Sequence, residues 1–386
     1  MKRLLLLLSL AASLVQANPN DGFNDTIDRT DPNFVKASLV IASPGEELFA
    51  CAGHAAIRLE CPTFDLDYVF SYESESAYSR VGRFFAGNLK MGMFAVPMAE
   101  YLKDYRAERR GVWLYELNLP PAVKQNLWKL LDEKVAVGPN LPYDYLKRGC
   151  ARAVYDCLSE AWSGHTITAE PWQEKYYQTR RELVGASLDD FPWTRFALHA
   201  IIGANLDWDE KMIDKVILPG DLVSYLQGVC LDGTPVLSRT PTEVLPCETS
   251  IRRPFFTPLM AALLFCALCV ANCFVRRPYG DLALLVLQAL FGAFLTYLVV
   301  FSSLPATTWN WLLIPFNPLP LLFWRWRRQW ALGFVFVLIA WSALMLLSTH
   351  ALTDPPYQWI VLGYIALYLK FIPKKFISMM KKGDLS

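Results

Sequence analysis

The sequence HAAIRLECPTFDLDYVFSY, from His54 to Tyr72, alternates apolar and polar residues in two runs that meet around Pro62-Thr63. Alternation with a period of two is typical of β-strands that bury one face, so this stretch predicts a β-hairpin. Its core face takes apolar side chains from both runs, namely Ala55, Ile57, Leu59, Leu66, Tyr68 and Phe70. The same alternation predicts that His54 lies on the polar face, together with Arg58.

The register of this hairpin depends on its turn. A tight turn with Cys61 opposite Phe64 brings the two apolar faces together, and a slip by one residue would set polar side chains against the core. The polar pairs of that register are His54 with Ser71 and Arg58 with Asp67. A turn that is longer by an even number of residues keeps both faces and moves only the pairs.

The N-terminus has a basic start, an apolar run from Leu4 to Val15 and a small residue, Ala17, at a cleavage-like site. This order is typical of an export signal, and the alternative is an uncleaved N-terminal anchor. The domain that follows is therefore expected outside the cytoplasm. The formal net charge of +1 gives no electrostatic reason to expect nucleic-acid binding.

From about Phe255 the chain contains five apolar runs, and the third, 309–324, is broken by prolines. If all five cross a membrane, every basic cluster falls on one side and the exported domain on the other. Three or four spans remain possible if the third run is re-entrant. The predicted segments are an export signal (1–17), a polar leader (18–35), an exported domain (36–250), a transmembrane domain (254–373) and a basic cytoplasmic tail (374–386).

The segment GCARAVYDCLSEAW, from Gly149 to Trp162, places Cys150 in the first turn of an amphipathic helix. A helix N-terminus and a nearby imidazole both favour a thiolate, and a histidine on a neighbouring strand can accept and return the proton. Cys150 and His54 have these settings. The group that orients the imidazole has three candidates, Ser71, Glu73 and Asp67. The alternative is that Cys150 fills the core and His54 is an ordinary polar residue.

Other reactive patterns are weaker. There is no metal-ligand pattern, no Gly-rich phosphate motif and no serine nucleophile elbow, so we expect neither a metal nor a cofactor. The remaining histidines fit a loop, a packed helix and an outer loop, and they are His165, His199 and His350. An oxidising compartment favours cysteine pairing, and Cys230 with Cys247, which flank a turn-rich stretch, is the pair that we predict.

Three parts of the chain carry a family resemblance: the PGEEL…GHAAIR block, GCAR at the start of the Cys150 helix, and the segment from Arg180 to Gly228. Together they resemble the exported domain of the Lnb-type lipoprotein N-acyltransferase family. The resemblance covers roughly Lys36 to Gly228, and a membrane-spanning tail also occurs in relatives.

This resemblance implies an α+β exported domain with a circularly permuted papain-like (NlpC/P60-like) fold, followed by an α-helical transmembrane bundle of about five spans. It implies that Cys150 is the nucleophile and His54 the base of an acyltransferase in the bacterial inner membrane. Its partners would be membrane lipids and lipoprotein N-termini. An acyl chain would move from a lipoprotein diacylglyceryl group to the N-terminal amine through a Cys150 thioester.

The chain departs from the family pattern in three places. Cys51-Ala52-Gly53 replaces LFG, Gly149 stands where Asn is common, and Ser71-Tyr72-Glu73 replaces NYG. The last change removes the family Asn, so Ser71, Glu73 and Asp67 all stay open as the orienting group.

Two arginines are candidates for contact with polar head groups, Arg58 and Arg181, with structural salt bridges as the alternative for each. Two further functions also stay open. One is a papain-like cysteine amidase or peptidase at the membrane surface, and the other is a non-catalytic membrane sensor or scaffold. The sequence does not define the oligomeric state.

Overall fold

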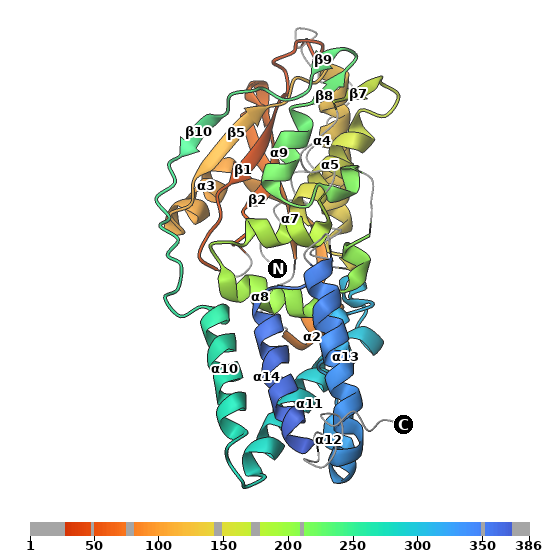
Figure 1. Cartoon of the computed structure of the whole chain (residues 1–386). Helices are drawn as coiled ribbons and strands as arrows, with labels where there is room; N and C mark the ends of the chain where they lie inside the picture. The colour runs from red at the N-terminus through yellow and green to blue at the C-terminus, as the bar shows by residue number, and fades with distance from the viewer. Residues whose placement is uncertain are drawn as a thin grey trace.

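The computed structural model of the chain describes residues 28–47, 50–74, 81–142, 149–170, 178–208, 212–348 and 352–372. The predicted export signal, most of the polar leader, His350 and the basic tail lie outside the described residues. Figure 1 shows a sheet domain at one end of the molecule and a group of long helices at the other.

The sheet domain is built on seven antiparallel strands in the order β10-β5-β1-β2-β3-β4-β6. These strands are β1 (Lys36–Ala42), β2 (His54–Cys61), β3 (Leu66–Ser74), β4 (Lys90–Pro97), β5 (Val112–Glu116), β6 (Leu141–Pro142) and β10 (Thr242–Leu245). A second sheet contains β7 (Ile167–Ala169), β8 (Val229–Leu231) and β9 (Thr234–Pro235). In the larger sheet β2 is an inner strand, hydrogen-bonded to β1 on one edge and to β3 on the other.

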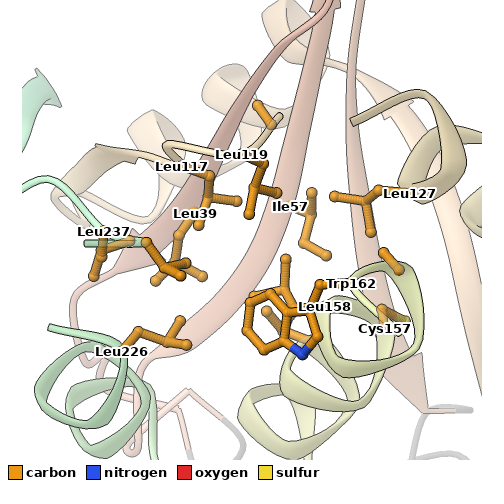
Figure 2. Close-up of a cluster of buried hydrophobic side chains, with 14 of the residues drawn as sticks. Leu39, Ile57, Leu117, Leu119, Leu127, Cys157, Leu158, Trp162, Leu226 and Leu237 are labelled. Atoms are coloured by element: carbon orange, nitrogen blue, oxygen red, sulfur yellow. The ribbon is translucent and has the colours of Figure 1, made fainter. Parts of the chain in front are cut away.

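Helices cover both faces of the larger sheet. The helices of this domain are α2 (Val81–Phe85), α3 (Met98–Ala107), α4 (Pro121–Val137), α5 (Cys150–Ala161), α7 (Arg180–Ser187), α8 (Pro192–Ile201) and α9 (Pro219–Leu226). On one face, α4, α5 and α9 bury the predicted apolar side of the hairpin. In Figure 2, Ile57 of β2, Leu127 of α4 and Leu158 of α5 lie around one common interior.

Local sequence explains where two of these helices begin and end. The first residue of α4 is Pro121, whose fixed φ suits the first helical turn, and the helix stops at Gly138, which has a φ of 69°. A capping box opens α7, because the Thr179 hydroxyl accepts the N–H of Glu182 while the Glu182 side chain accepts the N–H of Thr179.

The predicted hairpin is confirmed, but its register is shifted by two residues. Ala56, not His54, pairs with Ser71 in the ladder between β2 and β3. The connection is longer than a tight turn because Pro62–Phe64 forms a 3-10 turn and Asp65 then adopts a left-handed φ of 53°. An even shift preserves the two faces, so the predicted core face is right.

The face predicted to be polar is covered by α3, a cover that the sequence pattern does not predict. Ala56 and Val69 are fully buried there, in a cluster that includes Met98 and Tyr101 of α3. His54, at the first position of β2, is therefore partly buried and not on an open, solvent-exposed strand face.

The C-terminal helices are strongly apolar. They are α10 (Pro258–Asn272), α11 (Tyr279–Val300), α12 (Leu319–Leu322), α13 (Arg327–Leu347) and α14 (Pro356–Phe371). Among the described residues two helices, Tyr279–Val300 and Trp324–Leu347, are long and apolar enough to cross a membrane, and α10 is a shorter apolar helix. The proline-broken run 309–324 forms short helical turns and α12 instead of one continuous helix.

The sheet domain is joined to these helices by hydrogen bonds around α8, which lies between the two parts in Figure 1. The N–H of Gly203 donates to the carbonyl of Ala306 over 2.6 Å. The hydroxyl of Tyr357 in α14 donates to the carbonyl of Phe196 over 2.9 Å. Ala200 and Ile201 of α8 also belong to the apolar cluster of the C-terminal helices. The two parts therefore share one packed boundary.

The turn before β2 predicts a test of how the sheet positions His54. Gly53 has a φ of 78°, and a Cβ there would lie 2.8 Å from the carbonyl oxygen of Ala42. We expect Gly53→Ala to cost about 1–3 kcal/mol of unfolding free energy, because it adds a strained φ and a backbone clash. Chemical unfolding of the full chain in detergent measures it. Gly220→Ala, at a helical position with open space, is the control without loss, and equal stability of the two variants would contradict the argument.

Candidate active site

His54 is held at the start of β2 by pairing with Ala42 of β1 and by a hydrogen bond from its ring. Its Nε2 lies 2.8 Å from the Oγ of Ser71. Ser71 is fully buried on β3, and its hydroxyl lies near the carboxyl of Glu73, two residues along the same strand face, where it lowers the pKa of that carboxyl. In the tautomer that carries the proton on Nε2, the ring donates to the Ser71 hydroxyl. That arrangement leaves Nδ1 unprotonated and able to act as a base.

Cys150 is the first residue of α5, as predicted, and Gly149 precedes it with extended backbone angles. The backbone N–H groups of Ala55, Ala151 and Cys150 itself lie near the sulfur and favour its thiolate form. Because Ala55 directly follows His54, the thiol lies beside the strand position that carries the histidine. The structure thus brings both predicted residues to the same end of β2.

Arg110 is a charged group at this end of the sheet that the sequence pattern did not predict. Its Nε donates to the carbonyl of Ser43 over 2.8 Å, its Nη1 lies 3.0 Å from Glu108, and its guanidinium stacks on the ring of Tyr105 at 4.6 Å. The side chain is buried, and Nη2 has no hydrogen-bond partner among the described residues. Nothing in the local sequence marks Arg110, since its place depends on α3 and on the pairing of β5 with β1.

Burial controls the protonation of this site. The pKa of His54 is lowered from 6.5 to about 4, mainly by burial and to a smaller extent by the positive charge of Arg110. Burial raises the pKa of the Cys150 thiol, although three backbone N–H groups and Arg110 act in the opposite direction. At neutral pH the resting pair is therefore a thiol and a neutral imidazole, not a preformed ion pair.

Ser71 and Glu73 lie next to His54, whereas the third orienting candidate does not. Asp67 accepts two hydrogen bonds from Arg58, at 2.7 and 2.9 Å, and Arg58 also lies 3.0 Å from Glu60. Burial raises the pKa of Glu73, and the bond from Ser71 opposes that rise. The geometry favours Ser71 with Glu73 behind it as the orienting pair.

Both arginines proposed for head-group contact are engaged in ion pairs. Arg181 is fully buried and donates to Asp207 over 2.6 and 2.9 Å, with further bonds to the carbonyls of Ile202 and Gly203. The ion pairs of Arg181 and of Arg58 therefore favour a structural role for both arginines over contact with polar head groups.

The other histidines and cysteines are less suited to catalysis. His165 pairs with Asp232 over 2.6 Å in an exposed position, and His199 is buried within α8. Cys51 is close in sequence to His54, but burial raises its pKa to about 11. The predicted Cys230–Cys247 disulfide is wrong: both thiols are free. Cys230 lies in the small sheet, whereas the Cys247 sulfur lies 3.5 Å from the hydroxyl of Ser43, beyond the edge of the large sheet.

Comparison with protein families identifies the class of protein. A family model described as the Lnb N-terminal periplasmic domain matches residues 23–184, and one described as the Lnb transmembrane domain matches residues 250–380. The chain is a membrane protein with a periplasmic domain and a transmembrane domain. It belongs to the Lnb family, and this membership indicates a membrane enzyme that modifies lipoproteins. Neither the search of curated proteins nor that of solved structures found a match.

The protonation of the site predicts how Cys150 reacts with an alkylating reagent. Because the thiol is neutral at rest, its alkylation rate should keep rising between about pH 6 and pH 9 without a plateau. Removal of the Arg110 charge should slow alkylation about threefold or more at fixed pH, since that charge favours the thiolate. Mass spectrometry of the Cys150 peptide from Arg110→Gln protein measures this rate. Exposed Arg109→Gln is the matched control, and a plateau below about pH 7 would show a preformed thiolate instead.

Proposed function

We propose that this protein is a thiol acyltransferase that moves an acyl chain from the diacylglyceryl group of a lipoprotein to the lipoprotein's N-terminal amine. The observation that carries the proposal is the position of Cys150. Its thiol lies at a helix N-terminus beside the strand that bears His54, in a domain packed on apolar helices. A nucleophile, a base and a membrane-spanning support are the parts that this reaction needs.

The first half-reaction forms a thioester. His54 takes the proton of the Cys150 thiol as the sulfur attacks the ester carbonyl carbon of the diacylglyceryl group. Backbone N–H groups at the start of α5 stabilise the oxyanion of the tetrahedral intermediate. The carbon–oxygen bond of the ester then breaks, and the leaving alkoxide takes the proton back from the His54 imidazolium. The products are the acyl-thioester on Cys150 and a lyso-lipoprotein.

The second half-reaction transfers the chain to nitrogen. The N-terminal amine attacks the thioester carbonyl, and His54 accepts the proton that the amine loses. The carbon–sulfur bond breaks and the thiolate is protonated by His54, which restores the resting pair. Atoms and protons balance without any cofactor, and the product is an N-acylated lyso-form lipoprotein.

The order of the parts supports a circularly permuted papain-like fold for the sheet domain. The histidine strand β2 precedes the cysteine helix α5 in the chain, and α5 packs against β2 in space. Ser71 and Glu73 take the place of the orienting Asn that this chain lacks. They hold the ring through Nε2, which directs Nδ1 to the proton-transfer role.

The packing of the C-terminal helices supports a multi-pass topology with five crossings and a cytoplasmic C-terminus. At the domain end, Ser303 after α11 bonds to Ala86, and Asp354 before α14 bonds to Arg195. At the opposite end, Lys370 of α14 bonds to Asp281 at the start of α11. Trp324 contacts Phe371 at that same end, so the segment between α11 and α13 runs the length of the bundle. The basic clusters at 276–277 and 325–328 lie away from the sheet domain, as the charge rule requires.

Loss of either member of the pair tests the proposed reaction. We expect Cys150→Ala and His54→Ala to lower N-terminal acylation at least about a thousandfold, because each removes a group that bonds to the reacting atoms. Mass spectrometry of lipoprotein N-termini, in cells without any other N-acyltransferase, provides the readout. Cys230→Ala and His165→Ala are matched controls that should keep activity. Acylation that persists in folded Cys150→Ala protein would refute the proposal, and release of free fatty acid or of a cleaved peptide would indicate a hydrolase instead.

The orienting group is tested by three isosteric or truncated variants. Ser71→Ala should lower kcat about tenfold or more, because the imidazole loses the partner that fixes its tautomer. Glu73→Gln should lower it less, and Asp67→Asn should leave it within about twofold. The KM should change little in all three variants. A larger loss in Asp67→Asn than in Ser71→Ala would contradict this assignment.

A further inference from the structure

A partly open apolar pocket lies at the boundary between the sheet domain and the C-terminal helices. It has a volume of about 470 Å³, which is within the range of ligand pockets. The sheet domain contributes walls from α2, α7 and α8, and the bundle contributes side chains of α11 and α14. None of its described lining residues carries a formal charge, and most are aromatic or aliphatic. We call this space the boundary cavity.

One end of the boundary cavity reaches the residues that precede the catalytic histidine. Cys51 and Ala52 form part of its wall, and Gly53 then turns the chain into His54. Its lining also includes Phe291 and Phe294 of α11, which is one of the two helices, among the described residues, that are long and apolar enough to span a membrane. The cavity therefore has lining residues both from a membrane-spanning helix and from the turn that precedes His54.

A second, polar cavity adjoins the first. It has a volume of about 940 Å³, is lined by Arg110 and several carboxylates, and shares Thr194 with the boundary cavity. Both cavities border the segment that leads into His54, the polar one at Gly45 and Ala50 and the apolar one at Cys51. An amphiphile with an ester between its apolar and polar parts matches this sequence of surfaces.

We infer that the boundary cavity binds one fatty acyl chain of the ester substrate, with the carbonyl end at the turn formed by Cys51, Ala52 and Gly53. This inference rests on the proposed function and names the subsite that the acyl chain occupies. The bilayer interior and the cavity are similarly apolar, so transfer between them releases little free energy. The cavity therefore acts mainly by positioning the carbonyl and by limiting the length and shape of the chain.

Photolabelling tests this subsite without any need for turnover. Full-length Cys150→Ala protein is placed in phosphatidylcholine nanodiscs that contain a phospholipid with a diazirine near the end of one acyl chain. We expect labels on the peptides of α8 and α11 that line the boundary cavity. Ala197→Trp, an exposed cavity-lining position, should lower that labelling about tenfold because the indole fills the space. Ala267→Trp, on the exposed face of α10, is the matched control and should leave it unchanged.

Activity with donors of different chain length gives a second measure. In protein with the intact Cys150, Ala197→Trp should lower kcat/KM for long acyl donors and spare short ones, whereas general destabilisation would lower both. Phe294→Ala, which enlarges the cavity, should retain labelling and raise kcat/KM for the longest acyl donors. This variant provides the test if Ala197→Trp does not fold. Labels confined to lipid-facing surfaces, in a protein that does acylate lipoproteins, would overturn the inference alone. Cavity labelling in a protein without acyltransferase activity would overturn the proposed function and leave the acyl-chain subsite standing.

Discussion

The site depends on the fixed position of β2. This strand is hydrogen-bonded along both edges, to β1 and β3, and it is packed on both faces, by α5 and α3. A slip of one residue would turn Ile57 and Leu59 away from the core that they share with α5 and would bring side chains of the other face, such as Arg58, into it. The register of β2 is therefore strongly specified. His54 is the first residue of that strand. Its position is therefore set by the sheet, and Cys150 is set by the packing of α5 on the same strand.

The alternation of apolar and polar residues correctly predicted the strands that hold the site. An error of two residues in the register leaves each side chain on the same face, so that prediction did not depend on the exact turn. The connection at Pro62–Phe64 is longer than a tight turn, yet the shift is even and each side chain stays on its predicted face. The cover provided by α3 was not predictable in this way, since Met98 and Tyr101 are the buried residues of an otherwise polar helix. Arg110 was missed for the same reason, because its contacts come from elements distant in sequence. The disulfide prediction failed because spacing does not report which sheet a cysteine joins.

The enclosure of His54 has a chemical consequence. Burial lowers the pKa of His54 and raises that of Cys150, so both side chains favour their neutral forms. In the proposed reaction the thiolate therefore forms only as the reaction proceeds. The Arg110 charge favours the thiolate and opposes the imidazolium, so its effects on proton transfer between the two partly cancel. In the proposed reaction, we expect its net contribution to fall on negative charge that develops on the substrate carbonyl oxygen. A buried cation whose Nη2 has no hydrogen-bond partner within the described part of the chain is suited to that role because it needs little reorganisation.

The packed boundary between the two domains fixes the site relative to the C-terminal helices. Cys51, three residues before His54, is buried in one apolar cluster with Ile202, after α8, and Ala306, in the loop after α11. Hydrogen bonds from Gly203 and to Phe196 join the same region to the bundle. A reacting pair held in this way has little freedom to move toward its substrate. In the proposed reaction the ester therefore comes to the pair along the bilayer surface. We propose that the apolar pocket, which has lining residues from both α11 and the Cys51 turn, takes up its acyl chain without exposing that chain to water.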